Sequence, residues 1–254
     1  MLSAVEDSAP LAGGTWIMRR RGDGPPPSLY VSLQQIPTLR NLELGASPRF
    51  GACVTHSSLA SALSDADELA GLRDAAGRSA NPAVRNMATI GGGLAADAFP
   101  SSDLVPALLA LEAAVETAGG QSLPLEAFLE RRGGREHLIT AVLVPARPAR
   151  SAHARLLLRA GGEYPVAIVS VVDGGRGRLR VAVGSVTSVA FRWLALEARV
   201  GADDSPSSVA AAAQELLPTL APRDDVDAPA WYRAAVLPTL LERALTRLHD
   251  QPPA

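Results

Sequence analysis

The stretch that decides the fold is RNMATIGGGLAADAFPSSD, which runs from Arg85 to Asp103. Three glycines stand together at 91–93, directly after the apolar β-branched residue Ile90. Glycine lets backbone N–H groups approach an anion because no Cβ stands in the way, and successive exposed N–H groups form a nest that binds phosphate. The stretch therefore predicts a tight glycine turn whose backbone is open to a ligand.

A second glycine pair gives a similar pattern near the N-terminus. The segment PLAGGTWIM (10–18) indicates the end of a strand followed by a tight turn at residues 13 and 14. If the two turns meet in space, they could grip the two halves of a pyrophosphate, with Thr15 and Thr89 adding hydroxyl donors. Taken singly, each turn is more often an ordinary tight turn, because short motifs have a high false-positive rate.

The composition excludes several classes of function. The chain has 254 residues, of which 47% are hydrophobic and 20% charged, as is typical of a globular protein. Its formal net charge of -2 provides no basic field for nucleic acid or an anionic membrane. The sequence contains no lysine, so Schiff-base chemistry and a phosphate-binding loop lysine are excluded. Cys53 is the only cysteine, which excludes an intrachain disulfide and an iron–sulfur cluster held by this chain alone; we expect a buried structural thiol.

Competing motifs are absent from the sequence. The chain has no G-x-G-x-x-G, no G-K-[ST], no H-E-x-x-H and no G-x-S-x-G. The histidines at 56, 137, 153 and 249 are too scattered to predict a metal site, and we expect most of them at the surface or at helix caps. No apolar run reaches the length of a membrane span, and residues 1–10 do not resemble a signal peptide, so we expect a cytoplasmic protein.

Before residue 150 the pattern predicts a mixed α/β segment. Asp103, Ser101 or Ser102 is expected to cap a helix that continues to Gly119, and the alternative for Asp103 is a carboxylate near the ribose or ring edge of a nucleotide. The other expected elements are a strand in 28–36, a helix that begins near Thr55 or Ser57, helical residues over 68–80 and a buried strand over 137–145.

Beyond Pro145 and Pro148 the pattern changes. Three consecutive strands are expected, and the connection DGGRG (173–177) forms the hairpin between the last two. Two helical stretches, 208–220 and 229–249, follow them. The sequence thus predicts a β-β-β-α-α segment after about residue 149.

Several segments resemble one known family. VRNMATIGGGLAADAFPSSDLVPALLALEAAVE (84–116) resembles the second flavin-binding segment of the FAD subunit of molybdenum hydroxylases, the medium subunits of the xanthine dehydrogenase and carbon monoxide dehydrogenase type. LAGGTWIM (11–18) resembles the first flavin segment. GACVTHSSLA (51–60), HLITAVLVP (137–145) and the segment 222–245 are similar to further family segments in the same order, so the resemblance covers nearly the whole chain.

The resemblance implies an α+β fold and a redox role. It implies an FAD-binding domain of the vanillyl-alcohol-oxidase (PCMH) type with two α/β subdomains over 1–149, followed over 150–254 by a small C-terminal domain with a three-stranded antiparallel sheet and helices. Such an oxidoreductase subunit takes electrons from iron–sulfur clusters on a small partner subunit and passes them to an external acceptor. The molybdopterin and the 2Fe–2S clusters are expected only on the partner subunits, the large and the small one.

The resemblance also implies which residues contact FAD. The two glycine segments would hold the pyrophosphate, Asp103 would lie near the flavin, Leu138 and Ile139 would line the ring, and a basic residue and an aromatic one would lie near the isoalloxazine. The full expected set is Ala12, Gly13, Gly14, Thr15, Trp16, Ile17, Thr89, Ile90, Gly91, Gly92, Gly93, Asp103, Leu138, Ile139, Arg155 and Tyr164.

The sequence departs from the family pattern at four points. Gly93 stands where the family usually has asparagine or serine, one extra residue lies near Phe99, and Arg155 replaces the usual lysine. Only residues 1–11 precede the first glycine segment, where the family has a strand and a helix, so we expect an N-terminally short domain or a misassigned start. Two alternatives therefore stay open: a stand-alone flavin reductase of the same superfamily, and a cofactor-free scaffold subunit.

Overall fold

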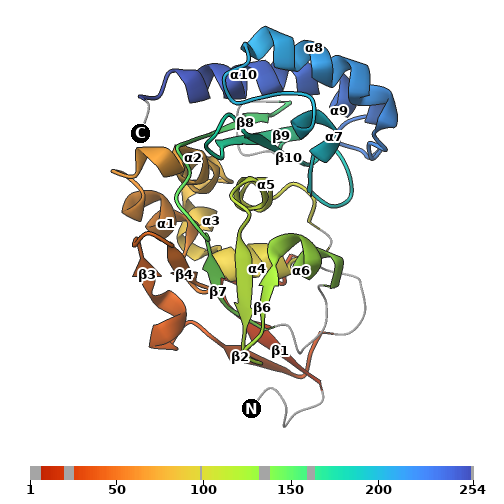
Figure 1. Ribbon diagram of the computed structural model, residues 1–254. Helices are drawn as coiled ribbons and strands as arrows, with labels where there is room; N and C mark the ends of the chain where they lie inside the picture. The colour runs from red at the N-terminus through yellow and green to blue at the C-terminus, as the bar shows by residue number, and fades with distance from the viewer. Residues whose placement is uncertain (1–6, 20–25, 98, 132–137, 159–163, 253–254) are drawn as a thin grey trace.

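The computed structural model describes residues 7–19, 26–97, 99–131, 138–158 and 164–252. Strands β1 (Ser8–Leu11) and β2 (Leu29–Ser32) pair in parallel as a two-stranded sheet at one end of the molecule (Figure 1). The chain leaves β1 through Gly14, whose φ of 70° is a conformation that glycine adopts without strain. The strand end and glycine turn predicted for 10–18, and the strand predicted in 28–36, are confirmed.

A five-stranded antiparallel sheet forms the middle of the molecule. Its order is β3-β4-β7-β5-β6, so β4 lies beside β7 although about 90 residues separate them in the sequence. The strands are β3 (Leu42–Glu43), β4 (Arg49–Gly51), β5 (Ala114–Thr117), β6 (Ser122–Pro124) and β7 (Ile139–Leu143). The buried strand predicted over 137–145 is β7.

The helices of this part begin at polar capping residues. Thr55 caps α1 by accepting the Ser58 N–H, and Asn81 caps α3 by accepting the Val84 N–H. The helix predicted to begin near Thr55 is therefore confirmed. The helices are α1 (His56–Ala62), α2 (Ala70–Arg78), α3 (Pro82–Met87), α4 (Ile90–Ala95), α5 (Leu104–Ala110) and α6 (Leu125–Arg131), with 3-10 turns at Pro37–Arg40 and Asp67–Leu69.

The helix predicted from residue 102 to Gly119 is wrong in its second half. The helix α5 ends at Ala110, and β5 follows at Ala114–Thr117. Apolar residues in ALEAAVET fit either period, and pairing of Val115 with Val142 of β7 draws this segment into the sheet. All seven residues of α5 are buried, because the helix is covered on every side.

The second half of the chain forms a four-stranded antiparallel sheet, in the order β11-β10-β9-β8. The three predicted strands and the hairpin at 173–177 are confirmed, but the sheet has a short fourth strand, β11, that the sequence pattern did not reveal. The strands are β8 (Arg150–Leu156), β9 (Ala167–Asp173), β10 (Leu179–Gly184) and β11 (Phe191–Arg192).

Helices cover both faces of this sheet. Helix α10 packs on β8 and β9 from one side and is itself packed against α8, and α2 and α5 pack on the sheet from the other side (Figure 1). Every residue of β9 is therefore buried. The helices predicted in 208–220 and 229–249 are confirmed, although the second divides at Val236. The elements are α7 (Leu194–Glu197), α8 (Pro206–Leu216), a 3-10 turn (Leu217–Thr219), α9 (Ala230–Ala235) and α10 (Leu237–His249).

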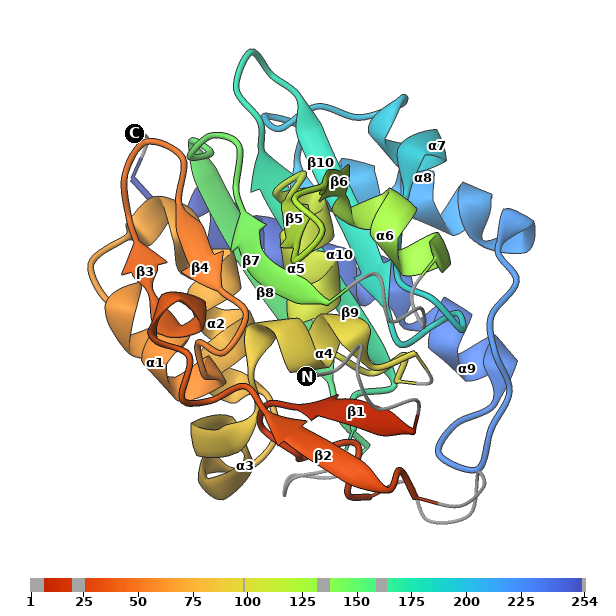
Figure 2. The ribbon, with the colours of Figure 1, turned by 90° about the horizontal axis from the view of Figure 1, so that it is seen from below.

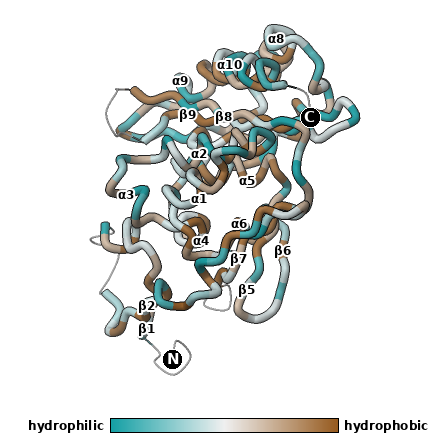
Figure 3. The backbone as a smooth tube through the Cα atoms, turned by 90° about the vertical axis from the view of Figure 1, so that its left-hand side faces the viewer, coloured by the Kyte–Doolittle hydropathy of each residue, from teal (hydrophilic) through white to brown (hydrophobic). Residues whose placement is uncertain are grey.

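The apolar core lies in two large clusters, one on each side of the four-stranded sheet. Figure 3 shows apolar backbone segments in the interior, around α4 and α5. Cys53 is 5% exposed and lies with Leu33 and Leu39 in a third, smaller cluster, so the prediction of a buried thiol is confirmed. In the described ranges, no helix is both long and apolar enough to cross a membrane.

Arg233 of α9 is the largest fully buried side chain, and it holds the C-terminal helices to the sheet. Its Nη1 donates to the carbonyl oxygens of Val166 (2.7 Å) and Ser185 (3.0 Å), and its Nη2 pairs with Asp225 (2.7 Å). A charge this deeply buried is tolerated because acceptors surround it.

We expect Arg233→Ala to lower the free energy of unfolding by roughly 3–5 kcal/mol, because it leaves buried acceptors without their cationic donor. Urea unfolding followed by circular dichroism measures this. Arg243→Ala, on the exposed face of α10, is the matched control and should change stability by less than about 0.5 kcal/mol. Equal urea midpoints for the two variants would contradict the assigned role of Arg233.

Candidate cofactor site

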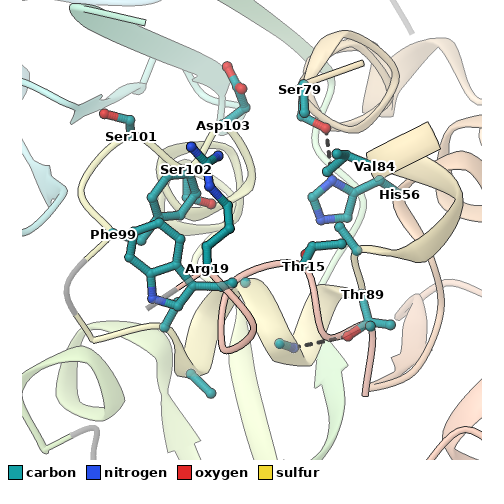
Figure 4. A pocket seen from close by; sticks show the side chains of 18 of the residues that line it. Thr15, Arg19, His56, Ser79, Val84, Thr89, Phe99, Ser101, Ser102 and Asp103 are labelled. Carbon is teal, nitrogen blue, oxygen red and sulfur yellow. Dashed lines mark hydrogen bonds between the residues drawn. The ribbon is translucent and has the colours of Figure 1, made fainter. Parts of the chain in front are cut away.

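A pocket of about 370 Å³ lies between the β1–β2 sheet, the helices α1, α3 and α4, and the end of β8. Figure 2 shows β1 and β2 next to α4 and α3, with β8, β9 and β10 farther back. Polar and aromatic side chains from separate parts of the chain converge on this pocket (Figure 4). Its wall comprises Pro10, residues 13–17, Arg19, His56, residues 79–81, Val84, Ala88, Thr89, Gly92, Gly93, residues 95–97, Phe99, residues 101–103, Arg155, Tyr164 and Pro165.

The two glycine segments meet, as the pyrophosphate hypothesis requires. A Cβ added to Gly13 would lie 2.0 Å from the carbonyl oxygen of Met87, so the first segment rests directly on the backbone that leads into Thr89. A Cβ on Gly91 would lie 2.7 Å from the Cβ of Ala52. At both positions glycine is required because two backbones pass too close for a side chain.

The second glycine segment is the first turn of α4 and not a tight turn, so that prediction is wrong. Thr89 is the N-cap, and its hydroxyl oxygen accepts the Gly92 N–H (3.2 Å). The Gly91 N–H donates to the Ala52 carbonyl and the Gly93 N–H to the Thr89 carbonyl, both at 2.9 Å. The open nest expected here is therefore absent, and the hydroxyl proton of Thr89 is what this segment can still donate.

The first glycine segment has the free donors instead. In the described part of the chain, no acceptor lies within hydrogen-bond range of the N–H groups of residues 13–16. The turn is closed further on, where the Met18 N–H donates to the Gly14 carbonyl (3.1 Å). Successive unpaired N–H groups on a loop favour an anion.

Asp103 is the most enclosed charge in the pocket, at 4% exposure. Its Oδ1 lies 3.2 Å from Nε2 of His153, and its Oδ2 lies 3.3 Å from Nη1 of Arg155. The other ring nitrogen of His153 lies 2.9 Å from the Ser170 hydroxyl. Asp103 is the N-cap residue of α5, one of the three positions predicted, but its side chain makes no capping hydrogen bond. Its carboxylate binds groups on β8 instead.

Two of the histidines that we expected at the surface are buried. His153 is 2% exposed and His56 is 9% exposed, because α1 and β8 turn them toward the interior. The Nδ1 of His56 lies 2.8 Å from the Ser79 hydroxyl. Burial lowers the pKa of His56 to about 4, which outweighs the opposite effects of the Asp103 carboxylate and of a contact between the ring and the Thr89 backbone. His249 lies at the end of α10 and bonds the Ala202 carbonyl, while residue 137 lies outside the described residues.

Aromatic rings form one wall of the pocket (Figure 4). The Trp16 and Phe99 centroids lie 4.6 Å apart, and Tyr164 meets Phe99 edge-on at 5.1 Å. The guanidinium of Arg19 lies 5.4 Å from the Tyr164 ring centroid and donates to its hydroxyl. Phe99, Arg19 and His56 were not in the expected set. The sequence signals for them were the extra residue near Phe99 and the family-like segment 51–60, which contains His56.

The pocket also gathers unsatisfied polar atoms. Trp16 Nε1, His56 Nε2 and Arg155 Nε are buried and have no hydrogen-bond partner in the part of the chain that the structure describes. Buried polar atoms are nearly always paired, so three such atoms on the walls of one pocket indicate a ligand that pairs with them. Flat rings, free N–H groups and these unpaired atoms together fit a dinucleotide that carries aromatic rings.

The structure brings most of the expected set to this pocket. The expected residues on its wall are Gly13, Gly14, Thr15, Trp16, Ile17, Thr89, Gly92, Gly93, Asp103, Arg155 and Tyr164. The other five lie behind it. Ala12 and Leu138 pack against the small cluster around Cys53, Ile90 and Ile139 belong to the main core, and Gly91 is buried against Ala52.

Comparison with known proteins identifies the class. The model of the family "FAD binding domain in molybdopterin dehydrogenase" matches residues 1–147. The chain belongs to this family of oxidoreductase subunits, and FAD is its cofactor. The expected α+β fold and family resemblance are thereby confirmed.

Relatives match along almost the full chain. The nicotine 6-hydroxylase medium subunit of Paenarthrobacter nicotinovorans is 30% identical over 96% of this chain and 91% of its own. The 6-hydroxypseudooxynicotine dehydrogenase complex subunit alpha of the same organism is 34% identical over 89% of this chain and 82% of its own. The carbon monoxide dehydrogenase structure from Hydrogenophaga pseudoflava superimposes with a TM-score of 0.81 at 28% identity, covering 96% of this chain and 90% of the matched one.

We expect His56 to make folding sensitive to acid. Its pKa is about 4 in the folded protein against 6.5 ordinarily, so the unfolded chain binds the proton more tightly. The neutral ring therefore costs no stability above pH 6.5. As the pH falls toward 4, the free energy of unfolding decreases by roughly 3 kcal/mol. Urea unfolding at pH 7 and pH 4.5 should show a smaller loss for His56→Gln than for the wild type. His249→Gln should behave as the wild type, and an equal loss in all three proteins would refute the expectation.

Proposed function

We propose that this chain is the FAD-binding electron-transfer subunit of a heteromeric molybdenum hydroxylase. In this role it passes electrons from iron–sulfur clusters on a small partner subunit to an external acceptor, while a large subunit carries the molybdopterin. The family match and the names of the relatives, which describe a medium subunit, a complex subunit and a medium chain, support this. The observation that carries it is the single pocket in which both glycine segments, Asp103 and the aromatic wall converge.

The two ends of the pocket would perform different tasks. Bound FAD supplies a ring system that stores electrons and releases them. The free N–H groups of residues 13–16 would bind its pyrophosphate, and the hydroxyl protons of Thr15 and Thr89 would add to that grip. Trp16 and Phe99 would contact a ring face and help to exclude water.

Charged groups at the other end would orient the flavin. Asp103 is held by His153 and Arg155, so its carboxylate has a fixed direction and can accept a hydrogen bond from the cofactor. Arg155 stands where the family usually has lysine, and its unpaired Nε is a further donor. The positive charge of its guanidinium would favour electron density on a nearby ring.

We further propose a domain boundary between residues 149 and 150. The family model ends at residue 147, and β8 begins at Arg150. The second domain would then contribute Arg155, Tyr164 and Pro165 to the pocket, so the cofactor would lie between the two domains.

The proposal is tested by loading and co-purification. The purified full chain is incubated with FAD, freed of excess cofactor and examined by visible spectroscopy, and we expect a flavin spectrum at equimolar occupancy. The tagged chain, isolated from its own host, should bring down molybdenum and iron in elemental analysis. A colourless chain after FAD loading would favour the scaffold alternative. A flavin-containing chain that reduces an acceptor with NAD(P)H alone would favour the stand-alone reductase.

We expect Gly13→Ala to weaken FAD binding by roughly tenfold or more, because the added methyl would push the first glycine segment off Met87 and widen the pocket. Quenching of FAD fluorescence on titration measures the Kd. Gly45→Ala is the matched control, since nothing lies within 4 Å of a Cβ at that position. If both variants bind as the wild type does, the contact between the glycine segments does not shape the FAD site.

A further inference from the structure

We infer that His56 is a cofactor-contacting residue, whose Nε2 accepts a hydrogen bond from a hydroxyl or ring N–H group of the bound dinucleotide. His56 lies in the family-like segment 51–60 but was not in the set of residues expected to contact FAD. The inference rests on the proposed function of the pocket and adds a specific contact to it.

The hydrogen bonds of Ser79 determine where the ring proton lies. The Ser79 hydroxyl has one proton and donates it to the Ala76 carbonyl (3.0 Å). It must therefore accept at its contact with Nδ1 of His56 (2.8 Å), which places the proton on Nδ1. In the neutral ring, Nε2 is then a lone-pair acceptor. Burial keeps the ring neutral at pH 7, since its pKa is about 4.

The acceptor faces open space in the pocket. The Thr89 backbone lies near enough to the ring to raise its pKa, but Nε2 is buried and makes no hydrogen bond with any described residue. A Cβ built on Gly93 would lie 3.9 Å from Nε2 and 4.0 Å from the Ser102 hydroxyl oxygen, with no closer neighbour. The bare Cα of Gly93 thus leaves a notch between two polar atoms. Figure 4 shows the His56 ring between Ser79 and the pocket interior.

The surrounding segment fixes the ring in this direction. Arg85 donates to the carbonyls of Ser79 (3.1 Å) and Ala80, which holds the loop that carries the Ser79 hydroxyl. His56 itself is the first residue of α1, and its N–H donates to the Ala88 carbonyl (3.0 Å). A rigid acceptor without a donor destabilises a folded protein, so a ligand that brings the donor gains affinity there.

Histidine NMR tests the inference directly on the full chain. The protein is labelled with ¹⁵N in its four histidines, and the spectrum is recorded before and after addition of FAD. We expect the Nε2 resonance of His56, assigned through its loss in His56→Gln, to move upfield as it accepts a hydrogen bond. The same titration with FMN and with ADP shows which half of the cofactor donates, and a shift with either half supports the inference.

Binding constants give a second, independent measurement. We expect His56→Leu to weaken FAD binding about tenfold, and His56→Gln, whose amide oxygen can reach the same place, to recover part of the loss. His249→Gln is the control and should bind as the wild type, because His249 bonds a carbonyl remote from the pocket. Circular dichroism checks that each variant folds. If His56→Leu does not fold, the NMR titration of the wild-type chain still shows whether His56 contacts the cofactor.

The outcomes separate the two proposals. If FAD binds but the His56 Nε2 resonance stays where it is, the inference is overturned and the proposed function stands. If the wild-type chain binds no FAD at all, both are overturned.

Discussion

The backbone contact at Gly13 is the constraint on which the site depends. The first glycine segment lies on the Met87 carbonyl with no room for a side chain, and this contact places the β1–β2 sheet against the start of α4. Gly91 makes a second close contact of this kind, where α4 meets the backbone of Ala52 directly after β4. The pocket is the space left beside these two contacts. Glycine therefore acts here first through close packing and only then through its N–H groups.

The buried carboxylate of Asp103 ties the second half of the chain to that pocket. A lone ionised carboxylate would be strongly destabilising at this depth, and each of its oxygens has a partner on β8. His153 extends the arrangement to Ser170 of β9, so the orientation of one pocket residue is fixed by two strands of the four-stranded sheet. The sheet thus contributes to the site by direct bonding as well as by covering the core.

Local signals in the sequence predicted the elements but not the environment of every residue. The helix start at Thr55 and the glycine turn after β1 depend only on neighbouring residues, and both were predicted correctly. The prediction for the segment after α5 was wrong because its apolar spacing suits a helix as well as a strand. Pairing with β7 makes it a strand. The burial of His56 and His153 depends on helices and strands distant in sequence, which no local pattern encodes.

The second glycine segment shows that a glycine motif alone does not predict which N–H groups are free to bind a ligand. Three successive glycines suggested three free N–H groups, yet each of these is consumed by the cap or by Ala52. The free donors lie on residues 13–16, and the unpaired acceptor lies on His56, across the pocket from the aromatic wall. A simple anion would satisfy only the donors. A ligand with an anionic centre, hydroxyl or N–H donors and flat rings satisfies all of them, and sites that leave buried groups unpaired discriminate strongly against ligands lacking the matching group.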